Sequence, residues 1–311
     1  MLKIGTHFSG IGAPEQALKN LGIAHKIEFA CEIDPKIQQI YLLNHSTRLM
    51  VHDISVANWG AAPYVDLLVA GFPCTDCSIA GSQNLAKGRT TLVSHTLDYV
   101  DSAKPKWVIL ENVKNLLNAK FANFYGGICS RLSANYIVAV MVLNSCDFGV
   151  AQNRERLFFV CIRKDLGAVP QVPNGVGGAP TTLATIMQTG VTTGIVPSGT
   201  KFYTDPYYIT STGYRQYDKS MAQPSPKGRR SSYERVYTPQ CISPTLTTQS
   251  KLPWVLDGTQ IRSLTTVERL RLQGFPDNFA FGGHASMAAH CIGNSMTVPV
   301  LEAIIKSNNI K

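Results

Sequence analysis

The alternation of strand and helix patterns over the first half of the chain is the feature that most limits its fold. Residues 65–72 form a nearly continuous apolar run, which is typical of a strand buried on both faces. Further strand patterns lie at 3–8, 26–32, 107–110, 136–143 and 157–162, with helical patterns between them at 14–21, 37–43, 94–103 and 124–132. This order predicts an α/β fold with a doubly wound, mostly parallel sheet, whose ligands bind at the carboxyl ends of the strands.

The composition changes near residue 167. Residues 168–258 are rich in Gly, Pro, Thr, Ser and Tyr and hold eight Lys or Arg against four Asp or Glu. We therefore expect a catalytic and cofactor-binding domain at 1–166, a smaller, irregular, β-rich domain at 167–257, and a return to the first domain at 258–311. Thr265 and Glu268 have capping-box spacing, Gly274 is a helix stop, and 296–307 is the expected last helix.

Charge and cysteine content narrow the class of protein. The net charge of +9 favours a polyanionic partner, and 44% hydrophobic against 16% charged residues excludes intrinsic disorder. No run of about 18 apolar residues occurs, and the chain reaches a glycine-rich turn too early for an export signal, so we expect no membrane partner and a cytoplasmic location. Eight cysteines are too few for a disulfide scaffold and are expected to be reduced.

A glycine-rich turn, Phe8-Ser9-Gly10-Ile11-Gly12, follows the first strand pattern and opens a helix. The dinucleotide fingerprint needs a further small residue where Glu15 stands, and a carboxylate there would repel a pyrophosphate. Glu32 ends the second strand pattern, where its carboxylate can accept hydrogen bonds from ribose hydroxyls. Asp53 can likewise accept a hydrogen bond from an adenine amino group. A nucleoside cofactor without a pyrophosphate fits, with S-adenosylmethionine the obvious one; a tight turn beside two solvated acids is the alternative.

Gly71-Phe72-Pro73-Cys74-Thr75-Asp76-Cys77-Ser78 follows the buried strand pattern. A cysteine at the end of such a strand can act as a nucleophile if a partner stabilises its thiolate. The spacing of Cys74 and Cys77 also permits a redox pair or half of a metal site, although no second pair of cysteines or histidines completes four ligands. Spacing alone leaves these three interpretations open.

Two polar motifs adjoin the next strand patterns. Glu111-Asn112 follows the strand at 107–110, where a partly buried carboxyl could donate a proton to a ring nitrogen. Gln152, Arg154 and Arg156 precede the strand at 157–162, and their alternation predicts a shared face suited to a carbonyl oxygen or phosphates. A helix N-cap and a solvated charged turn are the respective alternatives.

Taken in order, these motifs resemble the DNA (cytosine-5)-methyltransferases over nearly the whole chain. The resemblance continues through Arg262-x-Leu264-Thr265, through Glu268-x-x-Arg271-Leu272-Gln273-Gly274-Phe275-Pro276 and through Gly293-Asn294-Ser295. It implies a class I S-adenosylmethionine-dependent, Rossmann-like fold and identifies 167–257 as the target-recognition domain. The family's usual Pro-Cys-Gln-x-Phe-Ser reads Pro-Cys-Thr-Asp-Cys-Ser here, so Thr75 and Cys77 are departures, while the Pro-Cys core is retained.

The resemblance also implies a mechanism and its residues. Cys74 would add to C6 of a flipped-out cytosine in duplex DNA, Glu111 would engage N3 and the exocyclic amine, and C5 would take the methyl group, leaving S-adenosylhomocysteine. The other implied catalytic residues are Asn112, which orients the loop, Arg154, Arg156 and Gln152. The implied cofactor-binding residues are Phe8, Gly10, Gly12, Glu32, Ile33, Asp53, Pro73, Asn294 and Ser295. The candidates for DNA contact are Ser78, Arg89, Lys227, Arg229, Arg230 and Arg235.

We expect no metal, a monomer, and an activity that needs no cognate restriction endonuclease, in the nucleoid of a prokaryote or of a phage-infected host. Three other functions are weighed against this one: a tRNA cytosine-5 methyltransferase of the same fold, a catalytically weak DNA-binding relative, and a thiol redox protein built on Cys74 and Cys77. The variable segment of roughly 90 residues at 167–257 favours DNA over tRNA. The redox interpretation leaves Glu32 and the arginines unexplained.

Overall fold

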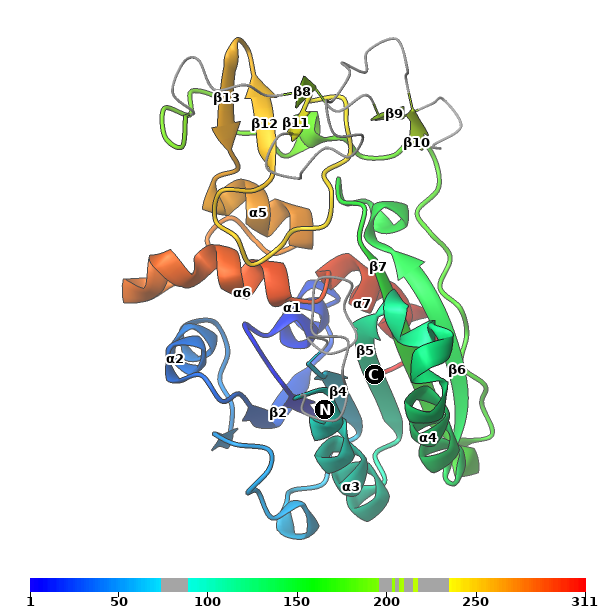
Figure 1. The fold of residues 1–311 in the computed structure, drawn as a ribbon. Helices are drawn as coiled ribbons and strands as arrows, with labels where there is room; N and C mark the ends of the chain where they lie inside the picture. The colour runs from blue at the N-terminus through cyan, green and yellow to red at the C-terminus, as the bar shows by residue number, and fades with distance from the viewer. Residues whose placement is uncertain (74–88, 196–202, 205–206, 210–214, 218–234) are drawn as a thin grey trace. The chain divides into compact units, whose positions relative to one another are not determined.

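The computed structural model describes residues 1–73, 89–195, 203–204, 207–209, 215–217 and 235–311; of residues 89, 90, 203, 204, 207–209, 215–217 and 235 it describes the backbone only. The chain forms two compact units (Figure 1). The first unit consists of Met1–Leu143, Glu155–Asn174 and Val300–Lys311, and the second of Asn144–Arg154 and Gly175–Pro299. The expected domain boundaries at 166 and 257 remain a prediction.

A seven-stranded sheet forms the centre of the first unit, with the order β3-β2-β1-β4-β5-β7-β6. Its strands are β1 (Leu2–His7), β2 (His25–Cys31), β3 (Met50–Val51), β4 (Leu67–Gly71), β5 (Trp107–Val113), β6 (Tyr136–Asn144) and β7 (Glu155–Arg163). The pairs from β3 through β5 are parallel, whereas β7 runs antiparallel to β5. The predicted α/β fold with a mostly parallel sheet is therefore confirmed.

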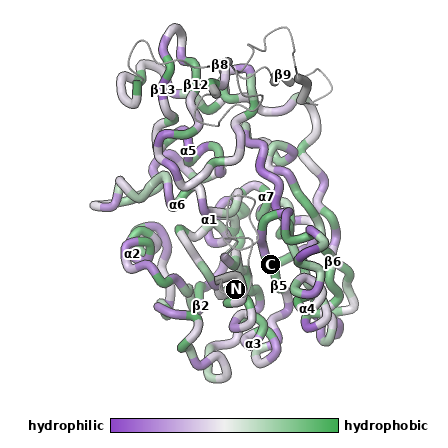
Figure 2. Tube along the Cα trace, viewed as in Figure 1, coloured by the Kyte–Doolittle hydropathy of each residue, from purple (hydrophilic) through white to green (hydrophobic). Residues whose placement is uncertain are grey.

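Among the described residues, four helices lie between these strands and a fifth lies near the end of the chain, each where a helical pattern was predicted. They are α1 (Ala13–Asn20), α2 (Pro35–Asn44), α3 (Val93–Ala103), α4 (Ala122–Ser133) and α7 (Val298–Ser307). Leu68 and Ala70 of β4 pack in one core cluster with Leu97 of α3 and Leu132 of α4. The alternate residues of β4, such as Leu67 and Val69, are also fully buried, so both faces of the sheet are covered, as its apolar strands require (Figure 2).

The order of the strands determines where a ligand can bind. From β1 the chain proceeds outward through β2 to β3 and then returns to β4 on the other side of β1. In an open α/β sheet, the crevice lies at the carboxyl ends of the strands where this reversal occurs, here between β1 and β4. The turn after β1 and Pro73 after β4 lie at that point.

The second unit contains a four-stranded sheet with the order β13-β12-β11-β8 and a two-stranded sheet of β9 and β10. Its strands are β8 (Tyr203–Thr204), β9 (Tyr207–Ile209), β10 (Arg215–Tyr217), β11 (Arg235–Tyr237), β12 (Trp254–Asp257) and β13 (Gln260–Ser263). Its helices are α5 (Thr266–Gln273) and α6 (Ala288–Asn294). The predicted capping box of Thr265 and Glu268 and the left-handed stop at Gly274 are both present.

No single helix in the described part of the chain is long and apolar enough to cross a membrane. The bent pair Gly282–Asn294 and Val298–Ser307 meets the length and composition requirement only when its two helices are counted together.

Candidate active site

The turn after β1 has the backbone that its glycines predict. Phe8, Gly10 and Gly12 all have positive φ angles, of 55°, 54° and 83°. A Cβ on Gly12 would lie 2.4 Å from Nε2 of His45, whereas a Cβ on Gly10 would have no atom of the described residues within 4 Å. Gly12 is therefore needed for packing and backbone geometry, and Gly10 leaves open space beside the main chain.

Glu32 follows β2 and holds the glycine turn. Its Oε2 accepts a hydrogen bond of 3.0 Å from the Gly10 amide, and its Oε1 accepts one of 3.0 Å from the Asp34 amide. Burial raises the pKa of Glu32, although these amides act in the opposite direction. Each carboxyl oxygen keeps a lone pair that can accept a further hydrogen bond, as the predicted contact with ribose hydroxyls requires. The next side chain, Ile33, is 68% exposed.

Asp53 follows β3 and is available to solvent. Its Oδ1 accepts hydrogen bonds from the amide and the hydroxyl of Ser55, at 2.8 and 2.7 Å, and these bonds hold the pKa of Asp53 below its usual range. The half-buried Pro73 follows β4. Because β1 to β4 are parallel neighbours, their carboxyl ends bring Gly10, Glu32, Asp53 and Pro73 to one edge of the sheet.

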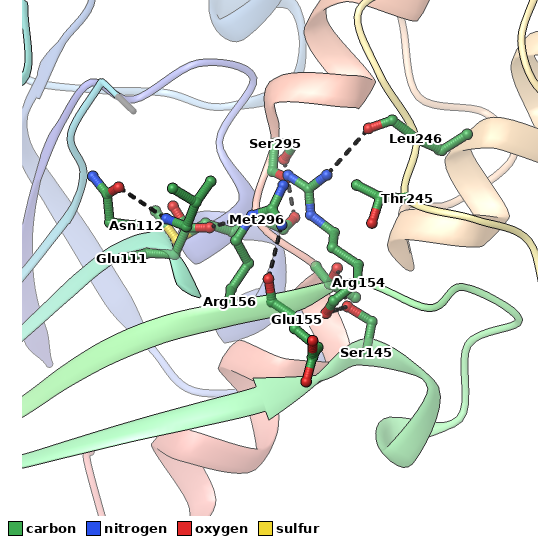
Figure 3. A network of polar contacts seen from close by, with 12 residues as sticks. Glu111, Asn112, Ser145, Arg154, Glu155, Arg156, Thr245, Leu246, Ser295 and Met296 are labelled. Atoms are coloured by element: carbon green, nitrogen blue, oxygen red, sulfur yellow. Dashed lines mark hydrogen bonds and ion pairs between the residues drawn. The ribbon is translucent and has the colours of Figure 1, made fainter. Parts of the chain in front are cut away.

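Glu111 and Arg156 form an ion pair at the same edge, where β5 ends. Oε1 of Glu111 lies 3.2 Å from Nε of Arg156, and both side chains are mostly buried (Figure 3). The antiparallel register places Val113 opposite Arg156 and Glu111 opposite Phe158, so the two charged residues are diagonal neighbours across the strands. The pair positions a carboxyl and a guanidinium together at the end of the sheet.

Asn112, next to Glu111 in the sequence, connects the end of β5 to the end of β4. Its side-chain amide donates a 3.0 Å hydrogen bond to the carbonyl of Phe72, and its Oδ1 accepts one of 2.9 Å from the Val113 amide. The side chain is fully buried. Asn112 therefore fixes the end of β4 directly before Pro73 and Cys74, which fits the predicted role in orienting that loop.

Gln152 and Arg154 form a second cluster, in the second unit. Gln152 donates to the carbonyl of Leu272 at 2.8 Å and accepts from the amide of Leu246 at 2.8 Å. Arg154 donates to the carbonyls of Ser295 at 2.9 Å and Leu246 at 3.3 Å (Figure 3). Both side chains are buried, and these bonds are to main-chain groups, so the geometry gives them positioning roles. Their predicted contact with a substrate stays a prediction.

Gln273 belongs to a motif that resembles the family, but the sequence predicted no separate role for it. Its Oε1 accepts from Thr297 at 2.7 Å, and its Nε2 donates to the carbonyls of Ile292 and Ser295. These bonds position Ser295, whose side chain is buried, while Asn294 is exposed and contacts His290. Asn294 and Ser295 belong to the second unit, as does Arg154.

Several predicted residues lie outside the described parts of the chain. They are Cys74, Ser78, Lys227, Arg229 and Arg230. For two others only the backbone is described: Arg89 begins a 3-10 turn, Arg89–Leu92, and Arg235 begins β11. Within the described residues, no group of three or more His, Cys, Asp or Glu side chains could hold a metal ion.

Comparisons with known proteins agree on one family. A family model described as C-5 cytosine-specific DNA methylase matches residues 2–309. The chain is 30% identical to the type II methyltransferase M.NlaX of Neisseria lactamica, covering 98% of this chain and 95% of that protein. It is 28% identical to the type II methyltransferase M.HhaI of Haemophilus parahaemolyticus, covering 96% and 91%.

Solved structures share the fold. The Dnmt2 methyltransferase of S. pombe matches with a TM-score of 0.70 at 17% identity, covering 98% of this chain and 97% of that one. A DNMT2 variant of Spodoptera frugiperda matches with a TM-score of 0.72 at 19% identity, covering 99% and 100%.

Proposed function

Because the chain belongs to the C-5 cytosine-specific DNA methylase family, we propose that it transfers a methyl group from S-adenosylmethionine to C5 of a flipped-out cytosine within a specific sequence of duplex DNA. The observation that carries this proposal is the Glu111–Arg156 ion pair at the carboxyl edge of the sheet. Asn112 joins that pair to the strand end from which Pro73 and Cys74 continue.

The residues at the sheet edge fit the cofactor. The left-handed backbone of Phe8 and Gly10 and the space beside Gly10 allow a ligand to approach the main chain closely. Acceptor oxygens of Glu32 and Asp53 suit ribose hydroxyls and an adenine amine, and the exposed Ile33 offers an apolar surface for the adenine ring. When bound there, the cofactor supplies the electrophilic methyl group that C5 accepts.

Residues of the chain make C5 able to accept that group. In the proposal, the Cys74 thiolate adds to C6 and the displaced π electrons make C5 nucleophilic. Glu111 engages N3 and the exocyclic amine, and Arg156 holds the Glu111 carboxyl in place and stabilises the cytosine carbonyl oxygen. After methylation, water takes up the C5 proton, the electrons of that C–H bond re-form the C5–C6 double bond, and the C6–sulfur bond breaks with its electrons returning to Cys74 as the thiolate.

DNA recognition is assigned to the predicted domain at 167–257. The net charge of +9 suits binding to a phosphate backbone, and Lys227, Arg229, Arg230 and Arg235 supply positive charge in that segment. A cytosine inside a duplex cannot be reached by Cys74, so the base must flip out of the stack. We propose a monomer that acts without a restriction endonuclease.

Expression in a host without cytosine methylation tests the proposal. The expected result is 5-methylcytosine in host DNA at one short recurring sequence, lost in Cys74→Ser and retained in Cys77→Ser. Methylation confined to tRNA would instead identify the related tRNA enzyme. If neither nucleic acid is methylated while S-adenosylhomocysteine still binds, the chain is a DNA-binding relative and the proposed reaction is wrong.

A further inference from the structure

Glu15, in the first turn of α1, has an unusual environment for a glutamate. Its side chain is 0% exposed, so it does not present a carboxylate at the surface of the glycine turn, contrary to our reading of the sequence. Its Oε1 accepts hydrogen bonds from the hydroxyl of Thr6 on β1, at 2.9 Å, and from the hydroxyl of Tyr41 on α2, at 2.7 Å. One carboxyl oxygen therefore joins three elements behind the turn.

The surroundings of Glu15 favour a neutral carboxylic acid. No lysine or arginine among the described residues forms an ion pair with it, and Lys19 on the same helix acts only at a distance. Its Oε2 is buried and has no hydrogen-bond partner among the described residues. A protonated oxygen tolerates such a position far better than a carboxylate oxygen, and burial accordingly raises the pKa of Glu15.

A chain of hydroxyl groups connects Glu15 to the glycine turn. The Thr6 hydroxyl lies 2.8 Å from the Ser9 hydroxyl. Because the Thr6 hydroxyl donates its proton to Glu15, it is the acceptor in its hydrogen bond with Ser9. The Ser9 hydroxyl also accepts a 2.9 Å hydrogen bond from the amide of Cys31 on β2. These contacts flank Phe8, a non-glycine residue with a φ of 55°, and such backbone persists only where its surroundings fix it.

We propose that Glu15, as a neutral acid, is a positioning residue for cofactor binding: through Thr6 and Ser9 it holds the Phe8–Gly12 turn in the shape that receives the nucleoside cofactor. The inference rests on the proposed function, because that function assigns the cofactor to this turn. Glu15 itself does not touch the cofactor. It acts through the hydroxyl chain.

Calorimetric titration of the full-length protein with S-adenosylhomocysteine tests this role. Glu15→Gln keeps a neutral acceptor of the same shape and should bind within about threefold of the parent, whereas Glu15→Ala should bind at least tenfold more weakly. Glu28→Gln is the matched control, since Glu28 is a second buried glutamate of the same unit but is ion-paired with Lys26 and Arg48. It should leave the affinity for S-adenosylhomocysteine unchanged.

The pH dependence of thermal unfolding separates the two glutamates further. A raised pKa means that the stability due to Glu15 is complete below pH 4.5 and falls as pH rises toward its folded pKa, so Glu15→Gln should gain in melting temperature over the parent between pH 5 and pH 8. The pKa of Glu28 is lowered, so its stabilisation is present above pH 4.5 and Glu28→Gln should lower the melting temperature throughout that range.

Three outcomes would overturn the proposal. One is a folded Glu15→Gln protein that binds S-adenosylhomocysteine tenfold more weakly, because an ionised Glu15 would then be required. Another is a Glu15→Ala protein with parental affinity, which would leave only a structural role. If Glu15→Ala does not fold, Thr6→Val breaks the same chain of hydroxyl groups. The third contradicting outcome is a Thr6→Val protein that binds S-adenosylhomocysteine as tightly as the parent. A parent that does not bind S-adenosylhomocysteine would instead contradict the proposed function.

Discussion

At the residue scale, Glu111 depends on Arg156 for its place at the sheet edge. Glu111→Gln removes the carboxyl group that the proposal places against N3 of the cytosine, and with it the ability to transfer a proton to that nitrogen, so we expect turnover to fall about 100-fold or more. Binding of S-adenosylhomocysteine should persist, because the cofactor residues follow other strands. The neighbouring, half-exposed Glu155, which pairs with Lys114, supplies the control: Glu155→Gln should keep turnover within about twofold. A Glu111→Gln enzyme with more than half of the parental rate would contradict the assignment.

His7, the last residue of β1, is predicted to make the protein sensitive to acid. It is buried beside Trp59 and Thr96, and burial lowers the pKa of His7 to about 3. An unfolded histidine takes up its proton near pH 6.5, so the stability due to His7 is complete above pH 6.5 and is lost as pH falls from there toward 3. Each pH unit in that window costs about 1.4 kcal/mol.

Denaturant unfolding between pH 7 and pH 4 measures this effect. His7→Phe should lose stability less steeply with falling pH than the parent, while His52→Gln, at an exposed position, should keep the parental slope. An unchanged slope in His7→Phe would show that His7 is not the group responsible. The acid sensitivity does not vanish completely, because burial also lowers the pKa of His45 to about 3.

At the element scale, the turn that joins β1 to α1 offers two glycines with different constraints. Gly12→Ala places a Cβ against His45 and retains a positive φ, so we expect a loss of several kcal/mol and a lower melting temperature. Gly10→Ala meets no atom of the described residues within 4 Å, so its cost to folding should be only about 1–2 kcal/mol from the left-handed backbone. Its added methyl group, however, occupies the space proposed for the cofactor.

Measuring melting temperature and S-adenosylhomocysteine affinity together separates the two effects. Gly10→Ala should lose affinity by more than tenfold with a small change in melting temperature, and Gly12→Ala should show the larger loss of stability. If Gly10→Ala binds S-adenosylhomocysteine as the parent does, the cofactor does not approach the main chain at Gly10.

Sequence patterns located these elements because burial on both faces of a sheet leaves long apolar runs. They also placed Glu32 correctly at a strand end, but they predicted no strand before Asp53, where the two-residue β3 lies. They could not show which carbonyls Arg154 binds, since Leu246 and Ser295 lie 92 and 141 residues away along the chain. Nor could they show that the Glu15 side chain is buried, because an acid in the first turn of a helix is usually exposed and favoured there by the helix dipole. Both facts depend on tertiary packing.

At the scale of the whole molecule, the chain passes between its two units more often than its composition indicates. Asn144–Arg154, which lies in sequence between β6 and β7, belongs to the second unit, and an isolated bridge pairs Gln152 with Ser243. Arg154 and Arg156 therefore belong to different units, although only Glu155 lies between them in the sequence. The segment connects the strand that carries Arg156 with the unit that contains the expected recognition strands.

The net charge of +9 leads to a prediction for the whole molecule. A protein that contacts six to ten DNA phosphates loses about 10³–10⁵ in affinity between 50 and 200 mM salt, because bound counterions are released on binding. We expect a decrease of this size for duplex DNA. The affinity for S-adenosylhomocysteine should change little, since its proposed contacts are hydrogen bonds and apolar surface.

Changing Lys227, Arg229 and Arg230 together to Gln should reduce the slope of log affinity against log salt by about 2.7, or about 0.9 for each lost phosphate contact. The control removes the same charge at Lys3, Lys104 and Lys164, which are exposed. Lys3 is the second residue of β1, Lys104 precedes β5, and Lys164 follows the antiparallel β7, so all three lie at the amino edge of the sheet, opposite the candidate site. The control should therefore keep the parental slope, and equal slopes for the two triple variants would show that the basic residues at 227–230 do not contact phosphates.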